Sequence, residues 1–423
     1  MRTRTIETEL RARVVWLLAG LVPLTAALPG CFEDEDPAAP IARPADAGAD
    51  AATAPDARTP GTGEPDASAP GDADANAPTE GGNAPAKVAD IAAGFAHTCV
   101  RLETNAVRCW GAGTYGQLGY ANGNSIGDLA TPASVGAGDV NVGGAVAELA
   151  LGDDHTCART ASGGVRCWGR GEHGRLGYGN VNDIGLLAAP AAAGDVNVGG
   201  PALGLAAAWS HTCARMAGGA VRCWGFGRHG KLGYGNTRDI GDDETPASAG
   251  DVNVGGPVAQ IAAGYAHTCA LLRSGAVRCW GAGGSGQLGY GNAVTIGDDE
   301  APASAGDVNV GGPVTQIVAG YVHTCALLSA GTVRCWGQGN TGQLGYGSVF
   351  PVGDDKTPAG VGDVSVGGRV VKLAAGYAHT CALLSTGAVR CWGFGASGQL
   401  GYGNTRSIGD DELPSSAGDV PLF

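Results

Sequence analysis

The feature that most constrains the fold of this chain is a unit of about 56 residues that occurs six times. A His-Thr-Cys triplet recurs with its cysteine at positions 99, 157, 213, 269, 325 and 381. A Cys-Trp pair follows at the same intervals, with its cysteine at positions 109, 167, 223, 279, 335 and 391. A period of roughly 40–60 residues with strand-like content is typical of β-propeller blades. The sequence therefore predicts an all-β propeller of six repeats, with a seven-bladed closure as the alternative.

One copy, residues 258–312, shows the expected layout of a blade. Three short strands are predicted over Val258–Ile261, His267–Leu272 and Ala276–Trp280, and Val308–Val310 is a candidate fourth strand. Helical periodicity is absent from the repeats, which supports an all-β assignment.

The turn between the second and third strands fixes their register. If Cys269 faces Cys279, then Leu272 faces Ala276, and a three-residue loop remains. Such loops favour a left-handed residue at their third position, which glycine and asparagine tolerate best. The residues at that position are Asn105, Gly163, Gly219, Gly275, Gly331 and Gly387.

The chain has 13 cysteines, and twelve of them form pairs whose members are ten residues apart. The register places each pair across a hairpin at a non-hydrogen-bonded position, within reach of a disulfide. Zinc bound by the repeated histidine and cysteines, and free buried thiols, are the alternatives. We favour disulfides, with the histidine as a hydrogen-bonding core residue and no metal or cofactor. The predicted bonds are Cys99–Cys109, Cys157–Cys167, Cys213–Cys223, Cys269–Cys279, Cys325–Cys335 and Cys381–Cys391.

The N-terminus has the pattern of an export signal. Residues 1–13 contain four arginines, residues 14–28 are apolar, and Leu-Pro-Gly-Cys follows. This pattern predicts a secretory signal over residues 1–31. Its end resembles a bacterial lipoprotein signal, which would make Cys31 the lipidated residue. A plain signal peptide and a buried apolar helix are the alternatives.

Charge and composition separate the next segment from the repeats. Residues 32–86 carry a net charge of −10 and are mostly Ala, Pro, Asp, Gly, Glu and Thr, which predicts a disordered linker. Residues 87–423 carry −6, and this mild acidity argues against nucleic acid as a partner. The predicted repeats span about 87–144, 145–200, 201–256, 257–312, 313–368 and 369–423.

The repeat resembles that of the regulator-of-chromosome-condensation family over roughly residues 87–423. The matching residues in one copy are His267, Ala270-Leu271, Gly275-x-Val277, Trp280-Gly281 and Gly286-Gln287-Leu288-Gly289. The resemblance implies a β-propeller, usually of seven blades. The founding member is a nuclear exchange factor for a small GTPase that also binds nucleosomes, a role that an exported, cysteine-rich chain does not suit. Other members are secreted bacterial propellers, including a protein inhibitor of β-lactamases, and these give the closer analogy.

Residues that vary at equivalent places in the repeats are candidates for binding a partner. The segment after Trp-Gly varies most, and in a propeller its six copies should gather on one face. Aromatic and arginine side chains are favoured anchors in protein interfaces. Drift on exposed loops is the alternative interpretation. The candidates are Tyr115, Arg170, His173, Arg175, Phe226, Arg228, His229, Lys231, Gln338 and Phe394.

Acidic triplets recur in three of the repeats, at 242–244, 298–300 and 410–412. Oxygen clusters can hold calcium, but the spacing matches no known calcium loop, so we interpret them as solvated loops.

These observations together predict a monomeric, non-enzymatic binding scaffold at the bacterial cell envelope, at the outer membrane or cell surface or in the periplasm. A secreted protein is the alternative. Its partner would be a protein or a glycan, and a lipid anchor would be its only link to the membrane. The alternatives are a hydrolase or lyase acting on polysaccharide or phosphate esters, and an exchange-factor-like regulator by family analogy alone. Paired carboxylates facing the central channel would indicate the hydrolase.

Overall fold

The structure is a computed structural model that describes residues 87–129, 131–134 and 138–422. The predicted signal segment with Cys31 and the predicted linker over 32–86 lie outside the described residues. Within the described ranges, no helix combines the length and the apolar character needed to cross a membrane.

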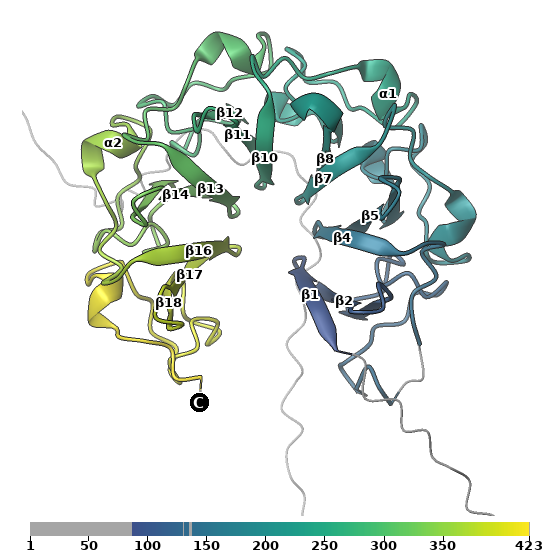
Figure 1. Cartoon of the computed structure of the whole chain (residues 1–423), viewed down its shortest axis with the longest axis horizontal. Helices are drawn as coiled ribbons and strands as arrows, with labels where there is room; N and C mark the ends of the chain where they lie inside the picture. The colour runs from purple at the N-terminus through teal and green to yellow at the C-terminus, as the bar shows by residue number, and fades with distance from the viewer. Residues whose placement is uncertain (1–86, 130, 135–137, 423) are drawn as a thin grey trace, which may run out of the picture. The chain divides into compact units, whose positions relative to one another are not determined.

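The described chain forms six three-stranded antiparallel sheets, one for each repeat, which we number blades 1 to 6 (Figure 1). The first strands are β1 (Val88–Ala93), β4 (Val146–Leu151), β7 (Ala202–Ala207), β10 (Val258–Ala263), β13 (Val314–Ala319) and β16 (Val370–Ala375). The middle strands are β2 (His97–Leu102), β5 (His155–Thr160), β8 (His211–Met216), β11 (His267–Leu272), β14 (His323–Leu328) and β17 (His379–Leu384). The third strands are β3 (Val107–Gly111), β6 (Val165–Gly169), β9 (Val221–Gly225), β12 (Val277–Gly281), β15 (Val333–Gly337) and β18 (Val389–Gly393).

Helical structure is limited to single turns in the connections. The α-helical turns are α1 (Pro246–Ala249) and α2 (Pro358–Val361). The 3-10 turns are η1 (Glu172–Gly174), η2 (Pro190–Ala193), η3 (Ala217–Gly219), η4 (Arg228–Gly230), η5 (Pro302–Ala305) and η6 (Pro414–Ser416). The predicted all-β class is therefore confirmed.

The hairpin between the middle and third strands has the predicted register. Cys269 lies opposite Cys279, and the amide of Leu272 donates to the carbonyl of Ala276 at 2.8 Å. The third loop residue has a positive φ in every blade, between 64° at Asn105 and 94° at Gly219. The sequence thus determines this turn locally, because only residues that tolerate the left-handed region occupy it.

All six predicted disulfides are present, with Cα–Cα distances of 4.0 to 4.1 Å. Because these twelve sulfurs are bonded in pairs, the zinc and free-thiol alternatives are wrong. Disulfides in such number indicate an oxidising, extracellular environment.

The predicted fourth strand does not form in any described blade. The amide of Val308 donates to the carbonyl of Val277 at 2.8 Å, but the amide of Val310 donates back to the carbonyl of Val308. One bond to the third strand does not make a ladder, so the segment crosses the edge of the blade as a turn.

Neighbouring blades pack the middle strand of one against the first strand of the next. At the junction of blades 4 and 5, Ile317 of β13 and Trp336 are fully buried. The indole of Trp336 lies against Gly289 of the preceding blade, where an added Cβ would be 2.8 Å from the indole nitrogen. Glycine at this position is therefore what lets the two blades approach.

A buried hydrogen-bond relay also crosses the five junctions between consecutive blades. At the same junction, His267 Nε2 lies 2.9 Å from Thr324 Oγ1, and that hydroxyl donates to the carbonyl of Gln287 at 3.1 Å. The hydroxyl therefore accepts from a protonated Nε2. Burial lowers the pKa of His267 to about 4, so the ring is neutral at physiological pH. The recurring histidine is thus a hydrogen-bonding core residue, as predicted.

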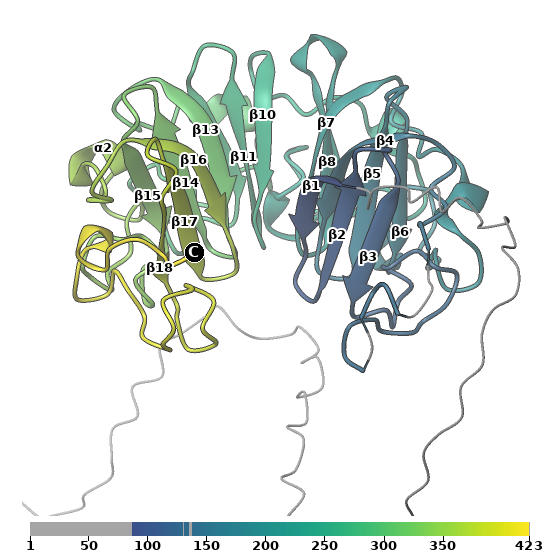
Figure 2. The ribbon, with the colours of Figure 1, turned by 60° about the horizontal axis from the view of Figure 1, so that its bottom comes forward.

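Blades 6 and 1 do not form such a junction, and we call the region between them the seam (Figures 1 and 2). Ile91 of β1 is 64% exposed, whereas Ile317 at the same position in blade 5 is 0% exposed. Leu383 of β17 is 36% exposed, whereas Leu327 of β14 is 5% exposed. At the axis the two end blades still approach, because the rings of Phe95 and Tyr377 have centroids 6.0 Å apart.

Candidate functional site on the axial face

One end of the propeller, which we call the axial face, carries the loops between first and middle strands. The turn segments after Trp-Gly lie at the same end, because the amide of Phe226 donates to the carbonyl of Ser210 beside His211. Blades 5 and 6 repeat this bond from Gln338 and Phe394. The predicted gathering of the variable turn segments therefore follows from the blade geometry.

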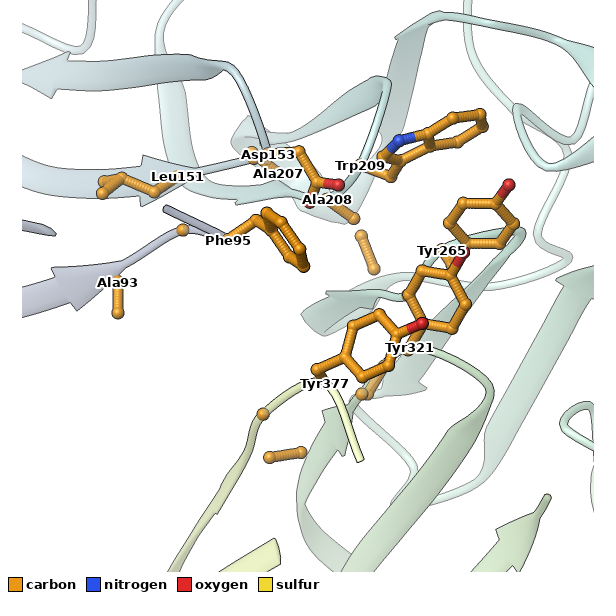
Figure 3. Close-up of a pocket in the computed structure, with 18 of the residues that line it drawn as sticks. Ala93, Phe95, Leu151, Asp153, Ala207, Ala208, Trp209, Tyr265, Tyr321 and Tyr377 are labelled. Atoms are coloured by element: carbon orange, nitrogen blue, oxygen red, sulfur yellow. The ribbon is translucent and has the colours of Figure 1, made fainter. Parts of the chain in front are cut away.

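A cavity of about 470 Å³ opens at the centre of this face and is lined by residues from all six blades. Its largest side chains come from one position of the repeat, two residues before the conserved histidine (Figure 3). Small residues, mainly alanine and glycine, line the rest. The six residues at this position are Phe95, Asp153, Trp209, Tyr265, Tyr321 and Tyr377.

Six rings on this face form a continuous series, which we call the aromatic arc. The arc is Tyr377, Tyr321, Tyr265, Trp209, Phe226 and His173. Successive centroids are 4.1 or 4.2 Å apart, except for the edge contact of 6.1 Å between Trp209 and Phe226. The arc therefore connects the central cavity to the turn segments of blades 3 and 2.

Lys231 lies under the arc and is buried. Its ammonium group is 4.6 Å from the ring centroid of Phe226 and 5.0 Å from that of Trp209, and it donates to Ser210 Oγ at 3.1 Å. Cation–π attraction of this kind is strongest where water is excluded. Lys231 thus supports the rings from below.

Asp153 is the exception in the series, because blade 2 places a carboxyl where other blades place a ring. Burial, with a smaller contribution from the nearby Asp154 carboxylate, raises the pKa of Asp153 to about 7. Arg175 and Lys231 act in the opposite direction but do not outweigh burial. A carboxyl of raised pKa in a cavity is a common mark of a functional site.

Blades 2 and 3 also differ in how their turn segments fold. In the other blades a glutamine Oε1 accepts a hydrogen bond from the backbone amide two residues earlier, as in the 2.9 Å bond from the Tyr115 amide to Gln117. Arg175 and Lys231 replace that glutamine and can only donate. Arg175 Nε accordingly donates to the carbonyl of Glu172 at 2.9 Å, so a carbonyl faces this side chain instead of an amide.

The reversed polarity places two histidines in the left-handed region. His173 has a φ of 59° and His229 a φ of 62°, unusual values outside glycine. His173 consequently stacks on Phe226, and its Nδ1 lies 2.9 Å from Asp239. A change from glutamine to a cation thus alters which side chains the turn presents.

The predicted contact residues therefore fall into distinct groups. Tyr115, Arg170, His173 and Phe226 come together, since the Arg170 guanidinium lies 4.8 Å from the ring centroid of Tyr115. Arg175 and Lys231 are buried beneath this surface instead of being exposed on it. The remaining candidates lie on the same face: Arg228 is half-buried, His229 is exposed, Gln338 is on blade 5 and Phe394 is on blade 6.

Sequence analysis missed the residues that line the central cavity. Their position varies among the repeats as the turn segments do, so the signal was available. What the repeats could not reveal is that residues about 56 positions apart stack on one another.

Within each acidic triplet, the three carboxylates have oxygen atoms that lie within 4.8 Å of one another. Burial raises the pKa of Glu244 to about 7, helped by a hydrogen bond with Asp243. The triplets are partly exposed, in keeping with the interpretation as solvated loops, and they form no part of the axial cavity.

Comparison with known proteins identifies the repeats. The pattern of the regulator of chromosome condensation (RCC1) repeat matches residues 88–117, 146–175, 258–287, 314–343 and 370–399, and a second pattern of that description matches 218–271, 274–327 and 330–383. The chain belongs to the RCC1 repeat family. The expected resemblance is thereby confirmed.

Curated relatives with RCC1 repeats have several functions. The chain is 31% identical to the ultraviolet-B receptor UVR8 of Arabidopsis thaliana over 75% of this chain and 68% of that one. It is 37% identical to the probable E3 ubiquitin-protein ligase HERC3 of Homo sapiens over 47% of this chain but only 18% of the ligase. The chain thus spans about two thirds of the receptor and a small part of the ligase. These relatives favour a binding or regulatory scaffold.

Solved structures agree on the fold. Human WBSCR16 superposes with a TM-score of 0.62 at 19% identity, covering 80% of this chain and 83% of that chain. Prp20p of Saccharomyces cerevisiae, described with its binding properties to Gsp1p and histones, superposes with a TM-score of 0.58 at 20% identity over 76% of each chain. Both likenesses support the RCC1-type β-propeller.

Proposed function

We propose that this RCC1-repeat protein is a non-catalytic scaffold that binds a protein partner with its axial face. The observation that carries the proposal is the aromatic arc beside an open central cavity. Stacked aromatic rings next to arginine side chains are the composition that dominates binding energy in protein interfaces. The exposed end of the arc, Tyr377, is 53% exposed, and Phe95 across the axis is 62% exposed.

The rigid frame suits this role. A disulfide joins each middle strand to the third strand of its blade. The histidine or threonine at the start of the middle strand takes part in the buried relay between blades. Loops held in this way lose little conformational entropy when a partner binds. The frame therefore presents the arc in one conformation.

The proposed location is the bacterial cell envelope, at the outer membrane or the cell surface. The disulfides support export, and the N-terminal sequence supports a lipid anchor at Cys31 with residues 32–86 as the linker. A monomeric propeller attached in this way would keep its axial face available to a partner.

The hydrolase alternative has less support. A glycosidase needs two carboxyl groups flanking the scissile bond. Among the described residues that line the axial cavity, Asp153 alone carries a carboxyl side chain. The nuclear exchange-factor role also fits poorly with a stapled, exported propeller.

The test uses the full chain displayed on its producing cells. Chemical crosslinking should join the wild type to a defined envelope protein, and Tyr377→Ala or Phe226→Ala should reduce that crosslink at least tenfold. Ser385→Ala is the matched control, because this exposed residue begins the hairpin loop at the opposite end of β17.

Equal crosslinking by wild type and both ring variants would refute recognition by the axial face. Thermal unfolding of each variant shows whether a loss reflects binding or folding.

A further inference from the structure

The series of rings around the axis has one vacant place, at blade 2. In blades 4, 5 and 6 the ring of Tyr321 lies between those of Tyr265 and Tyr377, 4.1 Å from each. Phe95 and Trp209 are the corresponding neighbours of Asp153. Because a carboxyl is much smaller than a phenol ring, the place between these two rings is open to the cavity.

The side chains around this place are arranged as a binding slot. Phe95, Asp153 and Trp209 line the same cavity, and the small residues Gly152 and Ala208 line it as well. In Figure 3 the Asp153 carboxyl lies between Phe95 and Trp209. A planar group that enters from the axis would lie next to the Asp153 carboxyl, with Phe95 and Trp209 as its aromatic neighbours.

The Asp153 carboxyl lacks a partner of its own. No hydrogen bond or ion pair joins it to any side chain within the described ranges, although Asp154 next to it is paired with Arg170 at 3.5 Å. Asp153 is half-buried at the cavity wall, so its carboxylate oxygens can accept hydrogen bonds from a group that enters the cavity. The carboxyl is therefore able to bind a hydrogen-bond donor of a ligand.

The charged groups that face Asp153 are engaged in other contacts. Asp154 belongs to the same loop, Arg175 bonds to Glu172, and Lys231 lies against the aromatic rings. His379 lines the same cavity, and burial lowers the pKa of that ring. Since Arg175 and Lys231 do not bring the pKa of Asp153 down to its ordinary range, a further cation would still stabilise its charged form.

We propose that the slot between Phe95 and Trp209 binds the guanidinium group of an arginine side chain on the protein partner. A guanidinium is planar, stacks on aromatic faces and donates two parallel hydrogen bonds to a carboxylate. An ammonium group lacks the planar shape that the ring-sized place requires. This inference rests on the proposed function and names the group that the axial face recognises.

The probe is a short peptide with a single arginine, and its neutral control has citrulline at that position. Citrulline keeps the planar shape and removes the charge. Titration of the full chain, followed by nuclear magnetic resonance of the indole groups, should show at least tenfold weaker binding of the citrulline peptide. Equal binding of the two peptides would overturn the proposal.

Two substitutions at one position separate charge from shape. Asp153→Asn keeps the size of the side chain and should weaken binding of the arginine peptide at least tenfold. Asp153→Tyr introduces the residue of blades 4 to 6, so it should fill the slot, preserve the fold and abolish binding. Binding that survives Asp153→Tyr in a folded protein would also overturn the proposal.

The pH dependence provides an independent readout. Binding requires the ionised carboxyl, so affinity should rise about fivefold between pH 6 and pH 7 and about tenfold between pH 6 and pH 8, and level off above pH 8. Asp154→Asn removes the neighbouring negative charge, which should keep binding and move this rise to lower pH. An affinity that is independent of pH in both proteins would contradict a role for Asp153.

The two proposals can fail separately. If the arginine peptide does not bind while Tyr377→Ala still prevents partner crosslinking, the slot is wrong and the axial interface stands. If the peptide binds and the ring variants crosslink normally, the slot is a binding site outside the partner interface.

Discussion

The five junctions between consecutive blades and the seam between blades 6 and 1 are built from the same residue types. At each junction an aliphatic residue of the first strand, a threonine and a tryptophan of one blade are covered by the preceding blade. Blade 1 has the same residues, Ile91, Thr98 and Trp110, but no blade covers them. The comparison teaches that a repeat contributes stability only through its neighbours, as expected of a quasi-one-dimensional assembly.

The largest expected difference between junctions and seam is in the response to acid. The buried histidines have folded pKa values far below the unfolded value of about 6.5. Their contribution to stability is complete above pH 6.5 and is lost as the pH falls towards 4. A difference of one between the folded and unfolded pKa of a group corresponds to about 1.4 kcal/mol. Urea unfolding should therefore give a free energy of unfolding that is several kcal/mol lower at pH 5 than at pH 7.5.

The position of the histidine sharpens this test. The fall in the free energy of unfolding between pH 7.5 and pH 5 should be reduced more by His267→Gln than by His379→Gln, because His379 has no following blade. Asp153 acts in the opposite direction in this window, since its folded pKa is raised. Equal effects of the two histidine variants would mean that the seam is closed in solution.

The next difference concerns buried aliphatic side chains. Ile317→Ala should reduce the free energy of unfolding by about 3 kcal/mol, because it leaves a cavity between blades 4 and 5. Ile91→Ala at the same position of blade 1 should change it by less than about 0.5 kcal/mol. Denaturant titrations of both variants measure the difference, and similar costs would show that β1 is covered.

The smallest difference concerns one hydroxyl group. Thr324→Val keeps the shape of the side chain but leaves His267 Nε2 and the Gln287 carbonyl unpaired, which should cost about 1–3 kcal/mol. Thr98→Val at the seam should cost less than about 0.5 kcal/mol. An equal loss of free energy of unfolding in Thr98→Val and Thr324→Val would contradict the proposed difference between the seam and the junctions.

The sequence predicts what is decided within one repeat. The period, the three strands, the hairpin register and the cysteine pairs all depend on residues within about 25 positions of one another. The left-handed residue of the loop fixes the register, and the register brings Cys269 to Cys279.

The sequence does not predict what depends on neighbouring repeats. Val308–Val310 alternates like a strand, but only the amide of Val308 bonds to the third strand, and the amide of Val310 bonds back to Val308, so no ladder forms. The arc needs the rotation between blades, which brings Tyr265 to Tyr321. The reversed turn at His173 follows from the loss of an acceptor when glutamine becomes Arg175, an effect that composition does not express.

The histidine–threonine relay has one direction around the ring, always from a blade to its successor. The two ends of the assembly are therefore different surfaces: blade 6 presents the histidine of the relay, His379, and blade 1 presents the threonine, Thr98. An in-frame duplication of one repeat would add one complete contact and reproduce the same two ends. Proteins built in this way can change their number of units during evolution without redesigning any contact between them.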